Sequence, residues 1–266
     1  MGFWRLIDVG LVEGSFGASI FEAVGIKCSR GSSPNTIVFW RVHPPCIYLG
    51  YHQLAKEEVN LENCERLGFQ VVRRVLGGGC VYCDKNQLLY SVIVNVKNSG
   101  FPLNMEKAYK KVLWGVVLAL KKLGLKNVYH EEKLNAIIVN GKKISGNAGL
   151  LDGNLLMVNG SLLLDFDYET MSMLLLNPTK NLPGNPKKPE DGLTSLKREM
   201  GEKPSFQKVK KVLRLGFEEA LNIKLKRGFL TKGELNLALK LKPKYLSREW
   251  VFHMDLKRKG LVEKKN

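Results

Sequence analysis

The chain has 266 residues, of which 44% are hydrophobic and 25% charged, a composition typical of a globular protein and too apolar for a disordered one. Its net charge of +17 favours acidic partners, but composition does not choose among acidic proteins, nucleic acid and membrane surfaces. No apolar run reaches the roughly 20 residues of a membrane span and the first residues lack a signal-peptide layout, so we predict a cytoplasmic protein.

The first hundred residues contain mostly strand patterns, with two helical ones. Apolar residues recur at helical spacing from Glu13 to Cys28, and a second helix is expected from Glu57 to Leu67, ended by Gly68. A glycine-rich turn separates the last two strands of this half. The predicted strands are 3–8, 35–41, 46–49, 69–75 and 88–96.

The second half begins with the longest amphipathic helix, Met105 to Leu123, which Gly124 is expected to close. Strands are predicted at 136–139 and 155–164, with a type I′ hairpin turn at Asn140-Gly141. Helices are expected at 205–221, with Ser205 as N-cap, and after a capping box formed by Thr231 and Glu234.

Together these elements predict an α+β fold with a central mixed, mostly antiparallel β-sheet flanked by helices. We expect one domain over residues 1–266. It would carry a proline-rich loop near 177–191 and a basic C-terminal tail. The basic runs are also what solvated helix faces and a frayed terminus would give.

A first segment with chemical potential runs from Arg73 to Asp84 and contains the glycine triplet 77–79. Glycine allows the main chain to approach a ligand closely, and bare N–H groups can cradle an anion. The two preceding arginines can pair with phosphate or carboxylate. A tight turn with surface arginines would give the same pattern.

A second segment runs from Asn140 to Gly149 and contains Lys142 and Lys143. In an extended chain one of these lysines points inward, where it can bind an anion as a point charge. A basic hairpin tip is the simpler interpretation. The GxxxxGK[ST] spacing of a phosphate-binding Walker A loop is absent.

The two segments together, RRxxGGGxVYxD followed about sixty residues later by NGKKISGNA, resemble the signature of the lipoate–protein ligase family. That family belongs to a larger group with the biotin–protein ligases and the octanoyltransferases. The resemblance extends over nearly the whole chain. It includes the stretches 47–53, 89–91, 160–164, 192–196 and 230–250.

The resemblance implies a site with a catalytic Lys143, which would bridge a carboxylate and an α-phosphate. It places Arg74 beside the ligand anion and makes Gly77, Gly78 and Gly79 the floor under the acyl chain. The further binding residues that it implies are Tyr82, Cys83, Asp84 and Asn147. Such a site would act by positioning and by electrostatic stabilisation.

Three positions depart from the family pattern. The family usually has histidine where this chain has Cys83, an acidic residue where it has Ala136, and histidine where it has Asn159. These departures suggest altered substrate contacts or a specialised paralogue.

The cysteine pattern argues against a metal site and against secretion. Five cysteines at scattered positions do not form a disulfide framework, and Cys80 and Cys83 would point to opposite faces of an extended segment. Zinc would also need two further ligands with suitable spacing, so no metal is predicted.

The resemblance therefore predicts an ATP-dependent lipoate–protein ligase. The predicted enzyme uses ATP and Mg²⁺ to activate lipoate or octanoate as acyl-AMP. It then acylates a lysine of a lipoyl-domain protein, either a 2-oxoacid dehydrogenase E2 or a glycine-cleavage H-type protein. A separate accessory subunit is a further possible partner, while membrane and nucleic acid are not expected partners.

Two alternatives stay open. The related octanoyl- and lipoyl-transferases use a cysteine nucleophile and no ATP, and residues 84–266 contain no cysteine, so Cys80 or Cys83 would have to take that role. The other is a non-catalytic paralogue that binds an acidic partner through its basic face.

Overall fold

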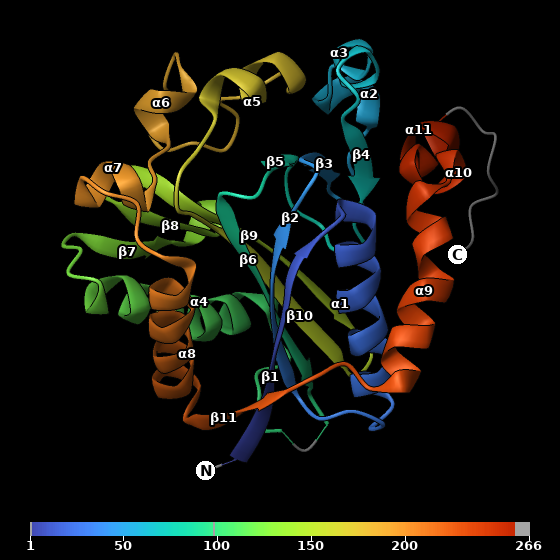
Figure 1. Ribbon diagram of the computed structural model, residues 1–266, viewed down its shortest axis with the longest axis vertical. Helices are drawn as coiled ribbons and strands as arrows, with labels where there is room; N and C mark the ends of the chain where they lie inside the picture. The colour runs from blue at the N-terminus through green and yellow to red at the C-terminus, as the bar shows by residue number, and fades with distance from the viewer. Residues whose placement is uncertain (1, 98, 259–266) are drawn as a thin grey trace.

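An eight-stranded sheet forms the centre of the computed structural model, which describes residues 2–97 and 99–258 (Figure 1). Its order is β11-β1-β2-β6-β10-β9-β8-β7, with β1 parallel to both neighbours and the other pairs antiparallel. The strands are β1 (Gly2–Val12), β2 (Thr36–Val42), β6 (Gln87–Asn95), β7 (Val128–Glu131), β8 (Ala136–Val139), β9 (Lys142–Asp152), β10 (Leu155–Leu163) and β11 (Ile223–Gly228). This mixed, mostly antiparallel sheet confirms the predicted fold class.

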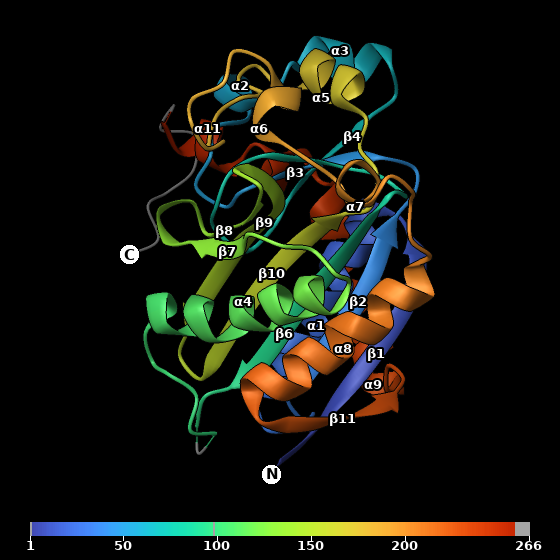
Figure 2. The same ribbon diagram turned by 90° about the vertical axis from the view of Figure 1, so that its left-hand side faces the viewer.

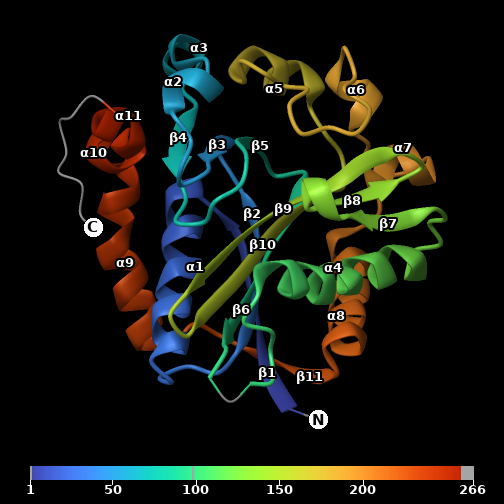
Figure 3. The same ribbon diagram turned by 180° about the vertical axis from the view of Figure 1, so that it is seen from behind.

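Helices cover both faces of the sheet. In Figure 1, α4 (Met105–Lys122) and α8 (Phe206–Leu221) lie to its left, and α1 (Gly14–Ser29) and α9 (Lys232–Leu246) lie to its right. Figure 2 looks onto α4 and α8, and Figure 3 shows the arrangement from behind. Each helix pair buries its own apolar cluster against the sheet, so the sheet is buried on both faces.

A second, three-stranded sheet lies at one end of the large one. Its order is β4 (Gln70–Arg73), β3 (Cys46–Leu49) and β5 (Val81–Cys83). Short helices surround it at the top of Figure 1, namely α2 (Ala55–Glu58), α3 (Leu61–Arg66), α5 (Tyr168–Leu174) and α6 (Pro189–Gly192). The glycine triplet lies between β4 and β5, and thus where the two sheets approach each other.

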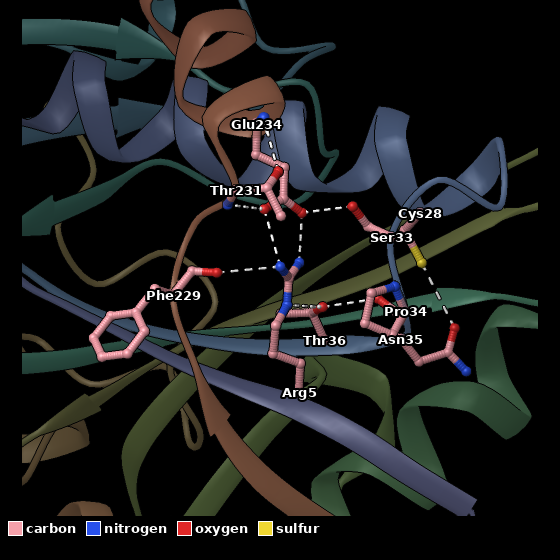
Figure 4. A network of polar contacts seen from close by, with 9 residues as sticks. All are labelled: Arg5, Cys28, Ser33, Pro34, Asn35, Thr36, Phe229, Thr231 and Glu234. Atoms are coloured by element: carbon pink, nitrogen blue, oxygen red, sulfur yellow. Dashed lines mark hydrogen bonds and ion pairs between the residues drawn. The ribbon is translucent and has the colours of Figure 1, made fainter.

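A buried ion pair fastens α9 to the first strand (Figure 4). Arg5 on β1 contacts both carboxylate oxygens of Glu234, which also accepts hydrogen bonds from Ser33 Oγ and from the backbone N–H of Thr231. Glu234 is fully buried, so these donors are needed to offset the cost of removing its charge from water. They hold the pKa of Glu234 below its usual value despite burial.

The C-terminal helices α10 (Arg248–Val251) and α11 (His253–Arg258) pack beside β4 through another buried charge. The Arg73 guanidinium donates to the carbonyls of Trp250 and Val251 and lies 3.5 Å from the Asp255 carboxylate. From residue 259 onward, the predicted basic tail lies outside the part of the chain that the structure describes.

Most predicted elements are confirmed, together with their local signals. Asn140 and Gly141 both have positive φ in a two-residue hairpin loop, and the capping box of Thr231 and Glu234 is present. Ser205 caps α8 by accepting a hydrogen bond from Lys208 N. None of the helices in the described part of the chain has the length and hydropathy needed to cross a membrane.

The sequence analysis missed several elements and mistook one. The predicted helix from Glu57 to Leu67 is wrong, because two short helices replace it and Asn60 caps the second. Strand β9 was missed since its Ser-Gly-Asn-Ala-Gly run lacks β-branched residues. Also missed were β5, β7, β11, α5, α7 (Leu196–Met200), α10 and α11. Residues 176–188 contain neither helix nor strand, and α6 follows them.

Helices α4 and α8 cross at two glycines. A Cβ on Gly216 would collide with the backbone carbonyl of Gly115, and one on Gly115 would lie 2.7 Å from Phe217 Cδ1. We expect Gly216→Ala to destabilise the protein by about 1–3 kcal/mol in urea unfolding, because backbone cannot move aside as a flexible side chain can. Gly233→Ala in α9 is the control. Its Cβ would meet nothing closer than 3.8 Å, so alanine should be neutral or stabilising by up to about 1 kcal/mol. Equal effects of the two substitutions would contradict the close crossing.

Candidate functional site

A cavity of about 300 Å³ lies where the small sheet meets the large one. Its deep end is apolar, because Phe21, Trp40, Tyr48 and Leu89 line it and each is at most 5% exposed. Its outer end is polar and includes the exposed Lys133 and Asn181. The cavity is therefore suited to a ligand with an apolar tail and a polar head.

The wall between these two ends is the glycine loop, which Arg74 holds in place. The Arg74 guanidinium donates to the carbonyls of Gly77, Gly79 and Tyr48, at 2.7–3.2 Å. Gly78 has φ +82, a region that side chains disfavour, and a Cβ there would lie 3.0 Å from Arg74 Nη2 and from Ala148 Cβ. Gly78 is thus needed both for the turn and for the close approach of β9.

Lys143 reaches the cavity from the start of β9. Its backbone carbonyl accepts a hydrogen bond from Thr194 N, and its Nζ donates to the Asn181 carbonyl at 3.2 Å. Gly146 leaves room for the side chain, since a Cβ there would lie 3.1 Å from Lys143 Cε. Loss of solvent around the ammonium lowers the pKa of Lys143 to about 8. A sizeable fraction of the amine is therefore neutral near physiological pH and can accept a proton.

A second cavity, of about 80 Å³, adjoins the first. The two cavities share Cys80, Lys143 and Asn181 in their walls. The second one also extends past Glu58 and a set of apolar side chains from α5, β10 and the loop before α6. Cys80 and Lys143 therefore lie where two cavities meet.

Three thiols lie in this region, and only one of them is partly exposed. Cys46 and Cys83 are direct partners across β3 and β5 and are fully buried. Cys80 is partly exposed and lines both cavities. Burial raises the pKa of Cys80 to about 12, while the nearby Arg74 acts in the opposite direction. Cys80 is thus a thiol in the free protein and needs a base to become a nucleophile.

Asn147 belongs to a hydrogen-bond network at the outer end of the cavity. It accepts a hydrogen bond from Tyr90 Oη and donates to the Asn135 carbonyl at 2.8 Å. Asn135 has the left-handed conformation (φ 46) and also lines the cavity. A Cβ on Gly160 would collide with both Tyr90 and Asn147, so that glycine makes room for the network.

The structure brings most of the predicted site residues together. Six of them line the larger cavity, namely Arg74, Gly78, Gly79, Cys83, Lys143 and Asn147, and Tyr82 lines the smaller one. Gly77 and Asp84 line neither, and Asp84 is buried in a local turn where its carboxylate accepts from Asn86. Arg74 differs from its expected role, because its donors are directed at backbone carbonyls rather than at an open ligand position.

The sequence analysis did not find the aromatic residues of the deep end or two residues from distant segments, Glu58 at the end of α2 and Asn181 in the loop before α6. Nothing in the local pattern marks them, since Phe21 lies in an ordinary helix and Trp40 in an ordinary strand. Of the three departures from the family pattern, Cys83 and Asn159 line the cavity, while Ala136 is buried in β8 away from it. No group of three or more metal-binding side chains occurs among residues 2–97 and 99–258.

Comparison with known proteins identifies relatives over nearly the whole chain. The family model described as lipoyl protein ligase A/B catalytic domain matches residues 19–218. The octanoyltransferase LipM of Kyrpidia tusciae is 32% identical, with 94% of this chain and 98% of that protein aligned. LipM of Bacillus subtilis is 28% identical over 93% of this chain and 98% of its own.

A solved structure matches the fold along the full chain. It comes from an archaeal lipoylation system of Thermoplasma acidophilum, described as a bi-partite lipoate protein ligase and its E2 lipoyl domain. The TM-score is 0.82 at 25% identity, with 100% of this chain and 99% of that chain covered. The predicted family resemblance and fold are thereby confirmed.

The prediction of an ATP-dependent ligase is wrong. Relatives that are 27–32% identical over almost their entire length are octanoyltransferases. The sequence analysis kept this ATP-independent group as an alternative. ATP and Mg²⁺ therefore lose the support that the resemblance gave them.

The lowered pKa of Lys143 predicts a pH-dependent cost in stability. The unfolded chain keeps this proton up to about 10.5, whereas the folded protein releases it near 8, so stability should rise with pH between these values. Below pH 8 the Lys143 ammonium is charged in the folded protein, and its burial then lowers the free energy of unfolding by the full amount. We expect Lys143→Met to stabilise the protein by about 1–3 kcal/mol at pH 7, with less gain at pH 10, in urea unfolding. Lys142→Met, one residue earlier, is the control, and an equal gain there would contradict a cost specific to Lys143.

Proposed function

Because the chain belongs to the lipoyl protein ligase A/B catalytic-domain family, we propose that it transfers an octanoyl group from a thioester donor to a lysine of an acceptor protein. The observation that carries this proposal is the cavity with an apolar deep end and with Cys80 and Lys143 at its junction with the smaller cavity. Without ATP the acyl group has to arrive already activated, and a thioester is the chemical class that supplies this.

The apolar end suits the octanoyl tail. Phe21, Trp40, Tyr48 and Leu89 provide a buried surface without a charged group, and each buried methylene contributes about 0.8 kcal/mol. With the tail at this end, the carbonyl carbon would lie toward Cys80 and Lys143. The polar outer end would then hold the donor's thiol arm.

In the first half of the reaction, the neutral amine of Lys143 accepts the proton of the Cys80 thiol. The resulting thiolate attacks the carbonyl carbon, and the donor leaves as a thiol that takes this proton back from Lys143. A thiolate beside an ammonium is stabilised by that charge, which offsets part of the unfavourable difference between pKa values of about 12 and 8.

In the second half, the amine of the acceptor lysine attacks the Cys80 thioester. Lys143 accepts the proton that the attacking nitrogen loses, and the Cys80 thiolate leaves and is reprotonated from Lys143. The products are an amide on the acceptor and the original thiol. Cys80 is a better candidate for this role than Cys83, because Cys83 is fully buried and lines only the larger cavity.

Lipoyl domains are the acceptors that we propose. The bi-partite neighbour of Thermoplasma acidophilum is described with an E2 lipoyl domain, and the net charge of +17 would accelerate encounters with an acidic domain. An accessory subunit stays a prediction.

The central test uses an octanoyl thioester of a small pantetheine-type thiol, a lipoyl domain and no ATP. The wild-type protein should gain the mass of one octanoyl group, and hydroxylamine should remove it. Cys80→Ala should lose this adduct and slow acceptor octanoylation at least 100-fold. Cys28→Ala, which removes a buried thiol outside both cavities, is the matched control. Full activity of Cys80→Ala would contradict the covalent route, and no transfer by the wild type would contradict the proposed function.

Lys143 gives a separate pH prediction. As a general base with a pKa of about 8, it should make kcat/KM rise with pH up to about 8 and then level off. Lys143→Met should lower the rate by about 10²–10⁴-fold and remove this rise. An unchanged pH profile in Lys143→Met would assign the titration to another group.

A further inference from the structure

The smaller cavity has room for a narrow chain only. Its volume of about 80 Å³ is far below the several hundred Å³ of a typical small-molecule site. Most of its wall is apolar. The apolar residues are Leu163, Phe166, Met171, Leu175, Leu182 and Leu193.

Its polar lining includes one carboxylate and the two groups that we propose to carry the reaction. Cys80 and Lys143 lie where it joins the larger cavity, and Glu58 contributes a carboxylate to its wall. A lysine side chain has the matching build, with four methylenes and one terminal amine. We propose that this cavity receives the acceptor lysine and that Glu58 recognises its ammonium group. The inference rests on the proposed function, since it assigns the second substrate of the same reaction.

Glu58 is placed to act on a cation that enters here. Its side chain is 12% exposed, and its carboxylate forms a 2.6 Å ion pair with Lys180, which is itself 50% exposed. The backbone fixes its position, because the Glu58 carbonyl accepts from Leu176 N and the next residue, Val59, bridges to Leu175. The carboxylate is also close enough to Cys80 to contribute to the raised pKa of that thiol.

The ion pair with Lys180 provides a counter-charge that an incoming ammonium can replace. Lys180 lies in the loop before α6 and can return to solvent, so one lysine–carboxylate pair would be exchanged for another. Such an exchange costs little, because the nearly buried carboxylate keeps a partner throughout. A carboxylate without a partner at this depth would be unfavourable.

Deeper in the smaller cavity the acceptor amine would meet a different environment. Ser145 lines this cavity, is fully buried and lies close to the Tyr90 hydroxyl. It can accept a hydrogen bond from the amine. Low exposure to solvent at this end disfavours the ammonium form of the acceptor, and the neutral amine of Lys143 can accept the proton that the acceptor loses when it attacks the thioester.

The arrangement also separates the two substrates. The acyl chain fills the larger cavity, so an acceptor that used the same entrance would have to pass the bound donor. Entry through the smaller cavity brings the amine to Cys80 from the other side. The negative charge of Glu58 would meanwhile disfavour an anionic donor on this path.

The test compares two variants that break the same ion pair from opposite ends. Glu58→Gln removes the carboxylate with little change in shape, whereas Lys180→Met keeps it and removes its counter-charge. Glu58→Gln should raise KM for the lipoyl domain about 5–20-fold. Acyl-enzyme formation from the thioester should not slow, because loss of the carboxylate removes one cause of the raised Cys80 pKa. Lys180→Met should leave that KM unchanged or lower it.

Hydroxylamine, a small uncharged nucleophile, separates recognition from chemistry. Its rate of deacylating the preformed octanoyl enzyme should be the same in Glu58→Gln and in the wild type, because it needs no carboxylate. The inference is overturned if Glu58→Gln leaves KM for the lipoyl domain unchanged. It is also overturned if Glu58→Gln slows deacylation by hydroxylamine as much as deacylation by the lipoyl domain, or if Lys180→Met raises KM for the lipoyl domain equally. No acyl-enzyme in the wild type would instead refute the proposed function, and the inference with it.

Discussion

Two neighbouring buried guanidinium groups at the end of β4 hold the site in shape. A buried charge is tolerated only when it is well paired, and Arg73 and Arg74 achieve this almost entirely with backbone carbonyls. Successive side chains on a strand point to opposite sides, so one arginine faces the glycine loop and the other faces the C-terminal helices. Arg74 bonds Gly77, Gly79 and Tyr48, while Arg73 bonds Gly50, Tyr51 and Gln53 as well as Trp250 and Val251. The glycine loop and the C-terminal segment are thus positioned from one point.

The low polarity of this region sets the chemistry of the two reactive groups. The same loss of solvent raises the pKa of Cys80 and lowers that of Lys143, so both groups favour their neutral forms before substrate arrives. In the proposed mechanism, a proton that leaves the thiol is accepted by the amine. An ammonium–thiolate pair becomes useful only when a carbonyl carbon is present to consume the thiolate. This arrangement limits reaction of the thiol with other electrophiles.

The sequence predicted those parts of the site whose residues are close together in the chain. The two motifs around Arg74 and Lys143 converge on one cavity, and the Asn140-Gly141 turn that sets the position of Lys143 was readable from its type I′ preference. Other features depend on contacts between distant segments. The donors of Arg74 are directed at carbonyls, Asp84 turns away into a local loop, and Glu58 reaches the site only because Val59 bridges to Leu175. No local pattern encodes such pairings.

The motifs do not distinguish a ligase from a transferase, and the reason is chemical. Both reactions require an acyl carbonyl held in place and an apolar pocket for the tail, and in this chain the glycine and lysine segments line a cavity of that kind. The two reactions differ in the group attached to the carbonyl. That group would lie toward the open end of the cavity, where loops form the walls.

The lack of cysteine after Cys83 seemed to argue against a transferase when only the order of residues along the chain was considered. In three dimensions the glycine loop faces Lys143 across the same junction of cavities, so a nucleophile on that loop can approach the carbonyl as well as one next to the lysine. The position of a nucleophile in the sequence is therefore a weaker constraint than the side of the carbonyl that it can reach.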